Sequence, residues 1–166
     1  EILDVIGGNP DIVRLYKTAH YSFVMPLSVG AILAGATDFQ LQAIEKYGTQ
    51  VGLAFQIQDD ILGVTGDPEV TGKSNSSDIT SGKQTHILQK TLELGDPKFI
   101  KKYYGTNKKT DQIRKMMQGC GAIEACKKLG LAHANQAKKY LGKITTNEKV
   151  KIILSQLADF VVLRNK

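Results

Sequence analysis

The chain has 166 residues, of which 42% are hydrophobic and 23% charged, and this is enough for one domain with a sizeable core. The net charge is +6, but the lysines are spread along the chain rather than gathered among aromatic residues. This distribution argues against a nucleic-acid-binding protein and suits an anionic substrate, whose local concentration a basic protein raises. The lack of tryptophan and the few other aromatic residues favour helices over an all-β fold.

Cys120 and Cys126 are the only cysteines, and they lack the spacing of a zinc or redox motif, so we interpret them as reduced intracellular thiols. The longest weakly polar stretch, residues 23–36, contains Pro26 and is shorter than the ~20 apolar residues that span a membrane. No signal peptide is recognisable. We therefore expect a cytoplasmic protein without a transmembrane segment.

The N-terminal region predicts two helices. The first begins at Asn9-Pro10, because proline favours the first helical turn, and leads into the pair Lys17-Thr18. The second covers residues 24–36, whose small side chains allow close packing, so we expect it near the centre of a bundle. Taken alone, Lys17 would be a lysine whose stem lies along an amphipathic helix and whose charge reaches solvent.

A long helix is predicted over residues 38–62, where apolar residues recur at helical spacing without any proline. One face of it is small or polar and carries Gly52, Gln56, Asp59 and Gly63, while the flanking positions are almost entirely apolar. A polar stripe between apolar flanks indicates a helix that lines a cavity inside a helical bundle.

Asp59 and Asp60 are predicted to stand at the C-terminal end of this helix. Helix C-termini carry partial negative charge, so two adjacent carboxylates are unfavourable there. A cation would relieve this cost, and paired carboxylates suit Mg²⁺ that keeps several waters and shares phosphate oxygens. An Asp-Asp pair taken alone is more often a solvated helix terminus.

The following loop is rich in glycine and begins with a turn at residues 66–68. Lys73 and Lys83 each follow a glycine, so the main chain can approach a ligand and the ammonium groups can meet phosphate. Asp78 lies between them. The loop is therefore a candidate cradle for a Mg²⁺–diphosphate, and His86 just beyond it fits the start of a helix. A Gly-Lys pair taken alone is usually a solvated turn.

The rest of the chain also predicts helices, with no repeat and no internal linker. They cover 85–94, 97–104, a segment capped by Asn107 or Thr110, 122–141 ended by Gly142, and a last segment capped by Thr146. The sequence thus predicts an all-α helical bundle that forms a single domain over residues 1–166.

Three motifs, F-Q-x-x-D-D, G-D-x-x-x-T-G-K and D-I-x-x-G-K-x-T, resemble the second aspartate-rich motif and the following loop of the trans-isoprenyl diphosphate synthases, the polyprenyl synthetase family. The segment K-T-x-x-Y-S-F-x-x-P-L is similar to another motif of that family, and Glu1 and Asp4 partly match a third. The sequence departs from the family at Gly63, where a third aspartate is usual. The resemblance implies the C-terminal portion of the isoprenoid synthase fold, and no first aspartate-rich motif D-D-x-x-D occurs in residues 1–54.

The implied reaction is head-to-tail prenyl transfer between isopentenyl diphosphate and an allylic diphosphate. The allylic C–O bond ionises, the double bond of isopentenyl diphosphate attacks the allylic cation, and a proton is lost. The resemblance also implies a homodimer that needs the missing N-terminal half of the synthase for activity. It assigns roles as follows: Asp59 and Asp60 hold Mg²⁺; Lys17, Lys73, Lys83 and Asp78 bind substrate; Thr18 and Gln56 direct oxygen dipoles at the cation; and Phe55 lines the cavity.

Two other classes of protein remain open. A class I terpene cyclase shares the bundle and the Mg²⁺–diphosphate chemistry, but its motif N-D-x-x-S-x-x-x-E is absent. A non-catalytic subunit of a heteromeric synthase would have no need of the charged set Lys17, Asp59, Asp60 and Lys73. The synthase is therefore the first hypothesis.

Overall fold

The computed structural model describes residues 15–66 and 75–165, and all regular structure within them is helical. The predicted all-α class is confirmed. The chain divides into two compact units, a first unit of residues Glu1–Gln56 and Gly130–Leu163 and a second unit of residues Ile57–Leu129 and Arg164–Lys166. Within the described part of the chain, no helix is both long and apolar enough to cross a membrane.

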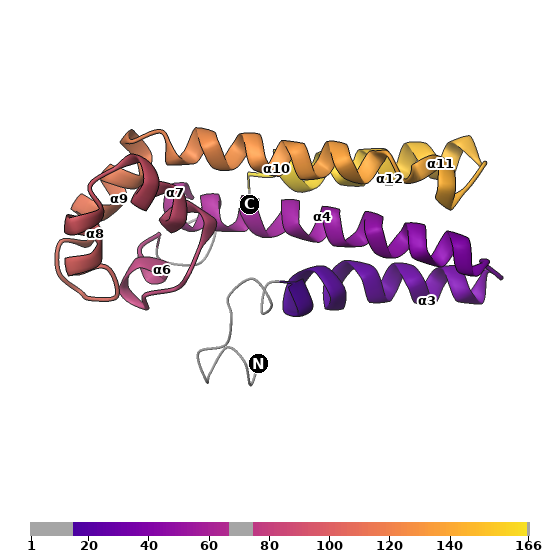
Figure 1. Cartoon of the computed structure of the whole chain (residues 1–166), viewed down its shortest axis with the longest axis horizontal. Coiled ribbons are helices and arrows are strands. Elements are labelled where there is room, and N and C mark those ends of the chain that lie inside the picture. The colour runs from indigo at the N-terminus through magenta and orange to yellow at the C-terminus, as the bar shows by residue number, and fades with distance from the viewer. Residues whose placement is uncertain (1–14, 67–74, 166) are drawn as a thin grey trace. The chain divides into compact units, whose positions relative to one another are not determined.

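Within the described residues, the first unit takes residues from six helices, two of which, α4 and α10, also contribute to the second unit. These helices are η1 (Leu15–Val24), α3 (Met25–Leu33), α4 (Asp38–Thr65), α10 (Ala122–Lys138) and α12 (Glu148–Leu163), with the short α11 (Leu141–Ile144) before α12. Figure 1 shows α3 beside the N-terminal part of α4. The core of this unit is built mainly on α4, α10 and α12, and includes Tyr47, Val51, Ala54, Ala134, Ala137, Ala158 and Val161.

Two glycines explain how η1 packs on α4. A Cβ atom at Gly52 would lie 2.4 Å from Cα of Ala19, and one at Gly48 would lie 3.0 Å from Cα of Val24. The distance at Gly52 is incompatible with a side chain and the one at Gly48 is tight, so glycine lets the two main chains come this close. The K-T segment is thereby held against the first part of α4.

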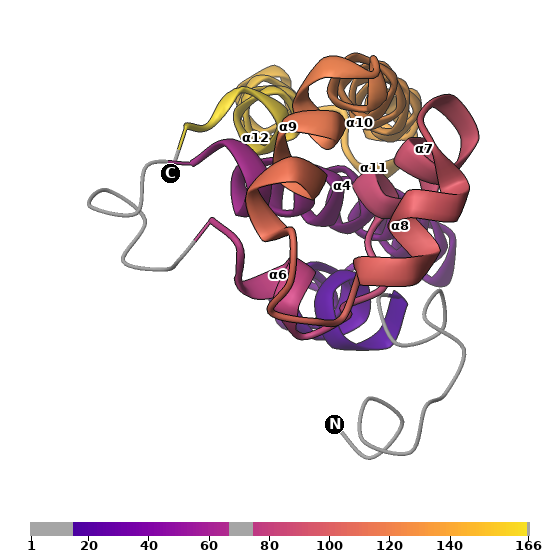
Figure 2. The ribbon, with the colours of Figure 1, turned by 90° about the vertical axis from the view of Figure 1, so that its left-hand side faces the viewer.

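In its described part, the second unit is built from the last part of α4, the first part of α10 and four shorter helices. The shorter helices are α6 (Ser77–Thr80), α7 (His86–Leu94), α8 (Pro97–Tyr103) and α9 (Thr110–Gly119). Helices α7, α8 and α9 contact one another, and α9 also contacts α6 (Figure 2). Their shared core contains Ile57, Ile61, Val64, Ile79, Ile87, Leu88, Ile100, Ile113, Met117 and Cys126.

The helix starts in the second unit follow local capping rules. Oγ1 of Thr85 accepts a hydrogen bond from N of Leu88 at 3.1 Å, so Thr85 caps α7. Asp96 caps α8 in the same way, and Pro97 occupies its first position. The cap predicted for α9 is wrong, because Lys109 precedes it in a left-handed conformation with φ 60° and Thr110 is already helical.

Several predicted boundaries differ from the structure. Helix α4 continues past residue 62 to Thr65. Helix α10 ends at Lys138, and Gly142 lies inside α11 instead of ending a helix. Oδ1 of Asn147, not Thr146, accepts from N of Lys149 at 3.0 Å at the start of α12.

Helix α3 does not occupy the central place that its small residues predicted. None of its residues is buried in the described structure, and Met25, Ile32 and Leu33 are 53%, 58% and 84% exposed. Small residues permit close packing but do not by themselves bring a partner. The helix start predicted at residues 9–11 lies outside the described residues.

Candidate functional site

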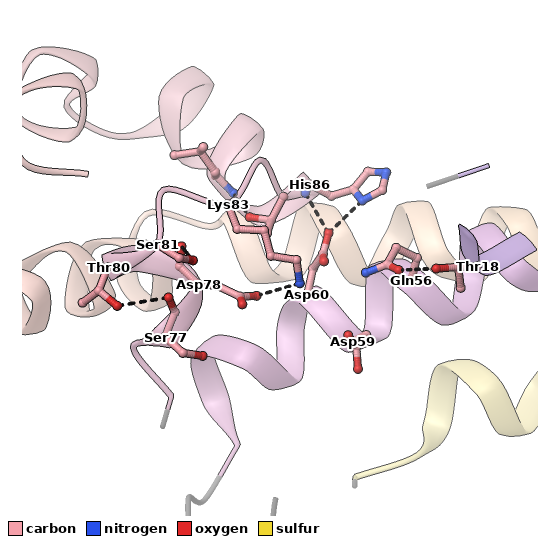
Figure 3. A network of polar contacts seen from close by, with 12 residues as sticks. Thr18, Gln56, Asp59, Asp60, Ser77, Asp78, Thr80, Ser81, Lys83 and His86 are labelled. Atoms are coloured by element: carbon pink, nitrogen blue, oxygen red, sulfur yellow. Dashed lines mark hydrogen bonds and ion pairs between the residues drawn. The ribbon is translucent and has the colours of Figure 1, made fainter. Parts of the chain in front are cut away.

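Asp59 and Asp60 are adjacent on α4, but their side chains point to different sides of the helix (Figure 3). Because α4 runs on to Thr65, the pair does not lie in its last turn, where the helix dipole acts most strongly. The helix-end repulsion predicted from the sequence is therefore smaller than expected. The surroundings of each carboxylate decide its properties instead.

The carboxylate of Asp60 is enclosed by protein. Its side chain is 1% exposed, and Oδ2 accepts from the main-chain N of His86 at 2.9 Å. The same oxygen lies 3.0 Å from Nδ1 of His86, and because an ionised carboxylate can only accept, the imidazole proton belongs on Nδ1. Since His86 opens α7, the negative charge also lies at the positive end of a helix dipole.

The carboxylate of Asp59 is open to water, with 47% of the side chain exposed. Nη2 of Arg164 lies 3.3 Å from Oδ1, and the main-chain O of Arg164 accepts from Nε2 of Gln58 at 2.8 Å. The sequence analysis missed Arg164, which lies 105 residues further along the chain and belongs to no local pattern. Asp59 therefore faces solvent and the guanidinium of Arg164.

Asp78 and Lys83 form an ion pair in the loop that follows α4. Nζ of Lys83 lies 3.2 Å from Oδ2 of Asp78, and N of Lys83 donates to O of Asp78 at 3.0 Å. A Cβ atom at Gly63 would lie 3.0 Å from Oδ2 of Asp78. The carboxylate of Asp78 thus approaches α4 at the position where the family resemblance leads one to expect a third aspartate.

Tyr104 fixes the same loop from outside the predicted motifs. Its hydroxyl donates to O of Lys83 at 2.6 Å, and N of the next residue, Gly105, donates to O of Ile79 at 2.9 Å. Burial raises the pKa of Tyr104 well above its usual range, so the hydroxyl stays a donor at neutral pH. A tyrosine at the end of a predicted helix gives no sequence signal for this contact.

In the first unit, the structure brings Thr18 and Gln56 together. Oγ1 of Thr18 donates to Oε1 of Gln56 at 2.8 Å, and the ring of Phe55 lies 5.4 Å from that of Phe23. Thr18 belongs to η1, a π-helix, and such helices are rare and often occur at functional sites. The contact joins two motifs that the resemblance assigned separately.

Two predicted substrate-binding lysines cannot be placed. The main chain of Lys17 belongs to η1, but its side chain is outside the described residues, as is the whole of Lys73. Of the three predicted lysines, Lys83 is the one whose contacts the structure describes, and it pairs with Asp78 rather than with Asp59 or Asp60.

The two carboxylates fit a divalent cation unequally. Asp59 fits, because it is exposed and Mg²⁺ is commonly held through one or two carboxylates while it keeps several waters. Asp60 does not fit in this arrangement, because one of its oxygens already meets two hydrogen-bond partners in a buried place. Within residues 15–66 and 75–165, no three His, Cys, Asp or Glu side chains are grouped to hold a metal ion.

Comparison with known sequences gives a consistent match. A family model described as polyprenyl synthetase matches residues 11–120. A geranylgeranyl diphosphate synthase of Methanosarcina mazei is 32% identical over 149 residues, which cover 89% of this chain and 46% of that protein. One of Sulfolobus acidocaldarius is 36% identical over 151 residues, which cover 84% of this chain and 44% of that protein.

Solved structures agree with the sequence matches. The geranylgeranyl pyrophosphate synthase of Corynebacterium glutamicum, complexed with isoprenyl diphosphate and magnesium, aligns with a TM-score of 0.84 and 29% identity over 98% of this chain and 49% of that one. The polyprenyl synthase of Caulobacter crescentus, complexed with calcium and isoprenyl diphosphate, aligns with a TM-score of 0.82 and 30% identity over 95% and 49%. The chain thus spans about half the length of the proteins it matches.

Proposed function

Because the chain belongs to the polyprenyl synthetase family, we propose that it serves a Mg²⁺-dependent condensation of isopentenyl diphosphate with an allylic diphosphate, which yields a longer isoprenyl diphosphate. The observation that carries the proposal is Asp59, a solvent-open carboxylate on the F-Q-x-x-D-D helix. The similarity to geranylgeranyl and other prenyl diphosphate synthases supports this reaction class. The magnesium in the Corynebacterium glutamicum complex supports the choice of metal.

The proposed reaction requires compensation of the negative charge on the leaving diphosphate. A bound Mg²⁺ would supply most of this compensation, and Asp59 is the described residue that would hold it. Lys83 adds a cation on a main chain fixed by Tyr104 and by Asp78. Lys17 and Lys73 are assigned to the same diphosphate by the resemblance.

The Thr18–Gln56 pair suits the other half of the proposed reaction, the stabilisation of an allylic cation. The hydroxyl of Thr18 directs its proton at Oε1 of Gln56, so its own lone pairs point elsewhere. Oxygen dipoles of this kind stabilise positive charge without offering a strong nucleophile that would trap it. Phe55, packed on Phe23, supplies an apolar wall next to the pair.

The test is product formation by the full-length protein. Labelled isopentenyl diphosphate and a series of allylic diphosphates should give longer isoprenyl diphosphates with Mg²⁺ and none with a chelator. A hydrocarbon formed from the allylic diphosphate alone would indicate a terpene cyclase. No product alone, but faster synthesis after addition of a second synthase, would indicate a non-catalytic subunit.

The proposal includes a cytoplasmic homodimer. The free state of Cys120 and Cys126 supports a reducing compartment, because such compartments keep thiols reduced. Cell fractionation and the mass of the native protein in solution test the two parts separately.

A further inference from the structure

The neighbouring carboxylates of α4 have different environments. Asp60 is 1% exposed and accepts from the main chain and the ring of His86, whereas Asp59 is 47% exposed and faces Arg164 at 3.3 Å. A ligand of Mg²⁺ must reach an ion that keeps several waters, which a solvent-open carboxylate can do and an enclosed one cannot. The two aspartates of the D-D motif are therefore suited to different roles.

Asp60 completes the start of α7 from another helix. The first N–H groups of a helix have no partner within it, and here Thr85 satisfies that of Leu88 while Asp60 satisfies that of His86. Asp60 lies 26 residues before His86, so this bond ties α7 to α4. A buried carboxylate is stable only with such partners, and the N–H group, the imidazole N–H and the helix dipole all provide them.

The bond between Asp60 and His86 also restrains the loop that carries Lys83, the proposed diphosphate-binding lysine. Lys83 lies three residues before His86, and its main-chain N donates to O of Asp78. At its other end the loop approaches α4 through Asp78, whose Oδ2 would be 3.0 Å from a Cβ atom at Gly63. The loop is thus held to α4 by the bond from His86 to Asp60 (Figure 3), and its Asp78 approaches α4 closely at Gly63.

We propose that Asp60 is a positioning residue rather than a metal ligand: its bonds to His86 tie α7 to α4 and so fix the Asp78–Lys83 loop on the segment that carries Asp59. The inference rests on the proposed function, because the loop matters only if Lys83 binds an anionic substrate. Asp60 then acts on substrate binding through Lys83, and Asp59 acts on metal binding directly.

The test compares Asp59→Asn and Asp60→Asn in the full-length protein, with Asp96→Asn as the matched control. Asp96 is also a helix-capping carboxylate of the second unit, but it caps its own helix. Hydrogen exchange of the α7 amides should accelerate about 10-fold in Asp60→Asn, because losing a charged cap costs about 1.4 kcal/mol. Asp59→Asn and Asp96→Asn should leave α7 exchange unchanged.

Binding of Mn²⁺, followed by electron paramagnetic resonance, separates the two roles. Asp59→Asn should weaken Mn²⁺ binding by about 10-fold or more, because a ligand is lost, while Asp60→Asn should change it by less than about 3-fold. In turnover, excess Mg²⁺ should partly restore Asp59→Asn. It should not restore Asp60→Asn, whose main defect should be a raised KM for the allylic diphosphate.

If Asp60→Asn does not fold, His86→Ala carries the test, because it removes the imidazole and keeps the carboxylate. It should accelerate hydrogen exchange of the α7 amides. It should leave the Mn²⁺ affinity within about 2-fold of the wild type, since only the contact between the imidazole and Asp60 is lost. The proposal is overturned if Asp60→Asn loses Mn²⁺ binding as Asp59→Asn does with normal α7 exchange, or if His86→Ala strengthens Mn²⁺ binding about 10-fold by freeing a ligand. The wild type could make no prenyl product while Asp60→Asn still accelerates exchange of the α7 amides. That result would support the positioning role of Asp60 and contradict the proposed function.

Discussion

The two units differ in how completely they bury their apolar and polar groups. Within the described residues, every large hydrophobic side chain that is exposed lies in the first unit except Leu94. The exposed ones concentrate on two helices, α3 and α12. In the second unit, by contrast, even polar residues are buried, and these are Asp60, Thr85 and Thr91.

This contrast indicates that the two units depend to different extents on contacts with other polypeptide. The second unit encloses a polar tie between α4 and α7 in a core of its own. The first unit leaves apolar helix faces open, and contiguous exposed apolar surface usually marks a site of protein contact. We therefore expect the first unit to be covered in the complete protein, and the second unit to be largely independent of that cover.

The largest expected effect concerns the chain of 166 residues by itself. It should be helical but form no prenyl product, because residues 1–54 lack a first aspartate-rich motif. It should also bind a hydrophobic dye more strongly than the full-length protein does, since α3 and α12 are open. Product formation by the purified 166-residue chain would refute the expected dependence.

The next effect separates function from stability in the second unit. In the full-length protein, Asp59→Ala should lower kcat by orders of magnitude, because a metal ligand is removed, while the melting temperature stays close to that of the wild type. The carboxylate of Asp59 is about half exposed, and its loss removes one partly exposed ion pair, that with Arg164, which contributes little to stability. Near-normal Mg²⁺-dependent turnover would contradict the assignment of Asp59.

The third effect tests whether the three predicted lysines bind the substrate specifically. Lys17→Ala, Lys73→Ala and Lys83→Ala should each reduce kcat/KM for the allylic diphosphate about 10-fold or more, which is about 1.4 kcal/mol. Lys128, which is exposed, is the control and should have little effect. Lys138 is a poor control, because its Nζ lies 2.5 Å from Oδ1 of Asp159. Equal losses in all variants, abolished by salt, would mean that net charge alone attracts the substrate.

A matched pair of isoleucines tests the contrast in packing. Ile113→Ala in the second unit should lower the free energy of unfolding by about 2–5 kcal/mol, because the side chain is fully buried. Ile153→Ala in the first unit should change it by less than about 0.5 kcal/mol in the 166-residue chain, since the side chain is 62% exposed. Denaturant unfolding measures both, and a large loss for Ile153→Ala would show that α12 is already covered.

The smallest expected effect concerns the reactivity of the two cysteine thiols. Burial raises the pKa of the Cys126 thiol to about 11, so at pH 8 only about one molecule in a thousand carries the reactive thiolate. Alkylation of the native protein should therefore reach Cys120, which is partly exposed, well before Cys126. Mass spectrometry of the labelled peptides measures the order, and equal rates would show that the core of the second unit opens readily.

The sequence predicts the helices of the second unit well where local chemistry decides. Thr85 and Asp96 are strong N-caps followed by apolar periodicity, so α7 and α8 begin where they were expected. Propensity could not choose between neighbouring cap residues at α12, because Thr146 and Asn147 both suit the position. It also could not foresee Lys109 before α9, since a left-handed conformation is uncommon for lysine.

The sequence predicts which residues belong to the candidate site, but not which of them contact one another. The stripe that holds Gln56 and Asp59 follows from helical spacing on α4. The bonds from Asp60 to His86 and from Asp59 to Arg164 join residues 26 and 105 positions apart, and no periodic pattern encodes such pairs. From the sequence, Asp59 and Asp60 look equivalent, whereas the tertiary structure gives them different partners and exposure.

Gly63 couples the effects of substitutions at two positions of the chain. Because a Cβ atom there would lie 3.0 Å from Oδ2 of Asp78, any other residue at 63 requires that carboxylate, which is paired with Lys83, to shift by a few tenths of an ångström. Substitutions at 63 and 78 are therefore epistatic.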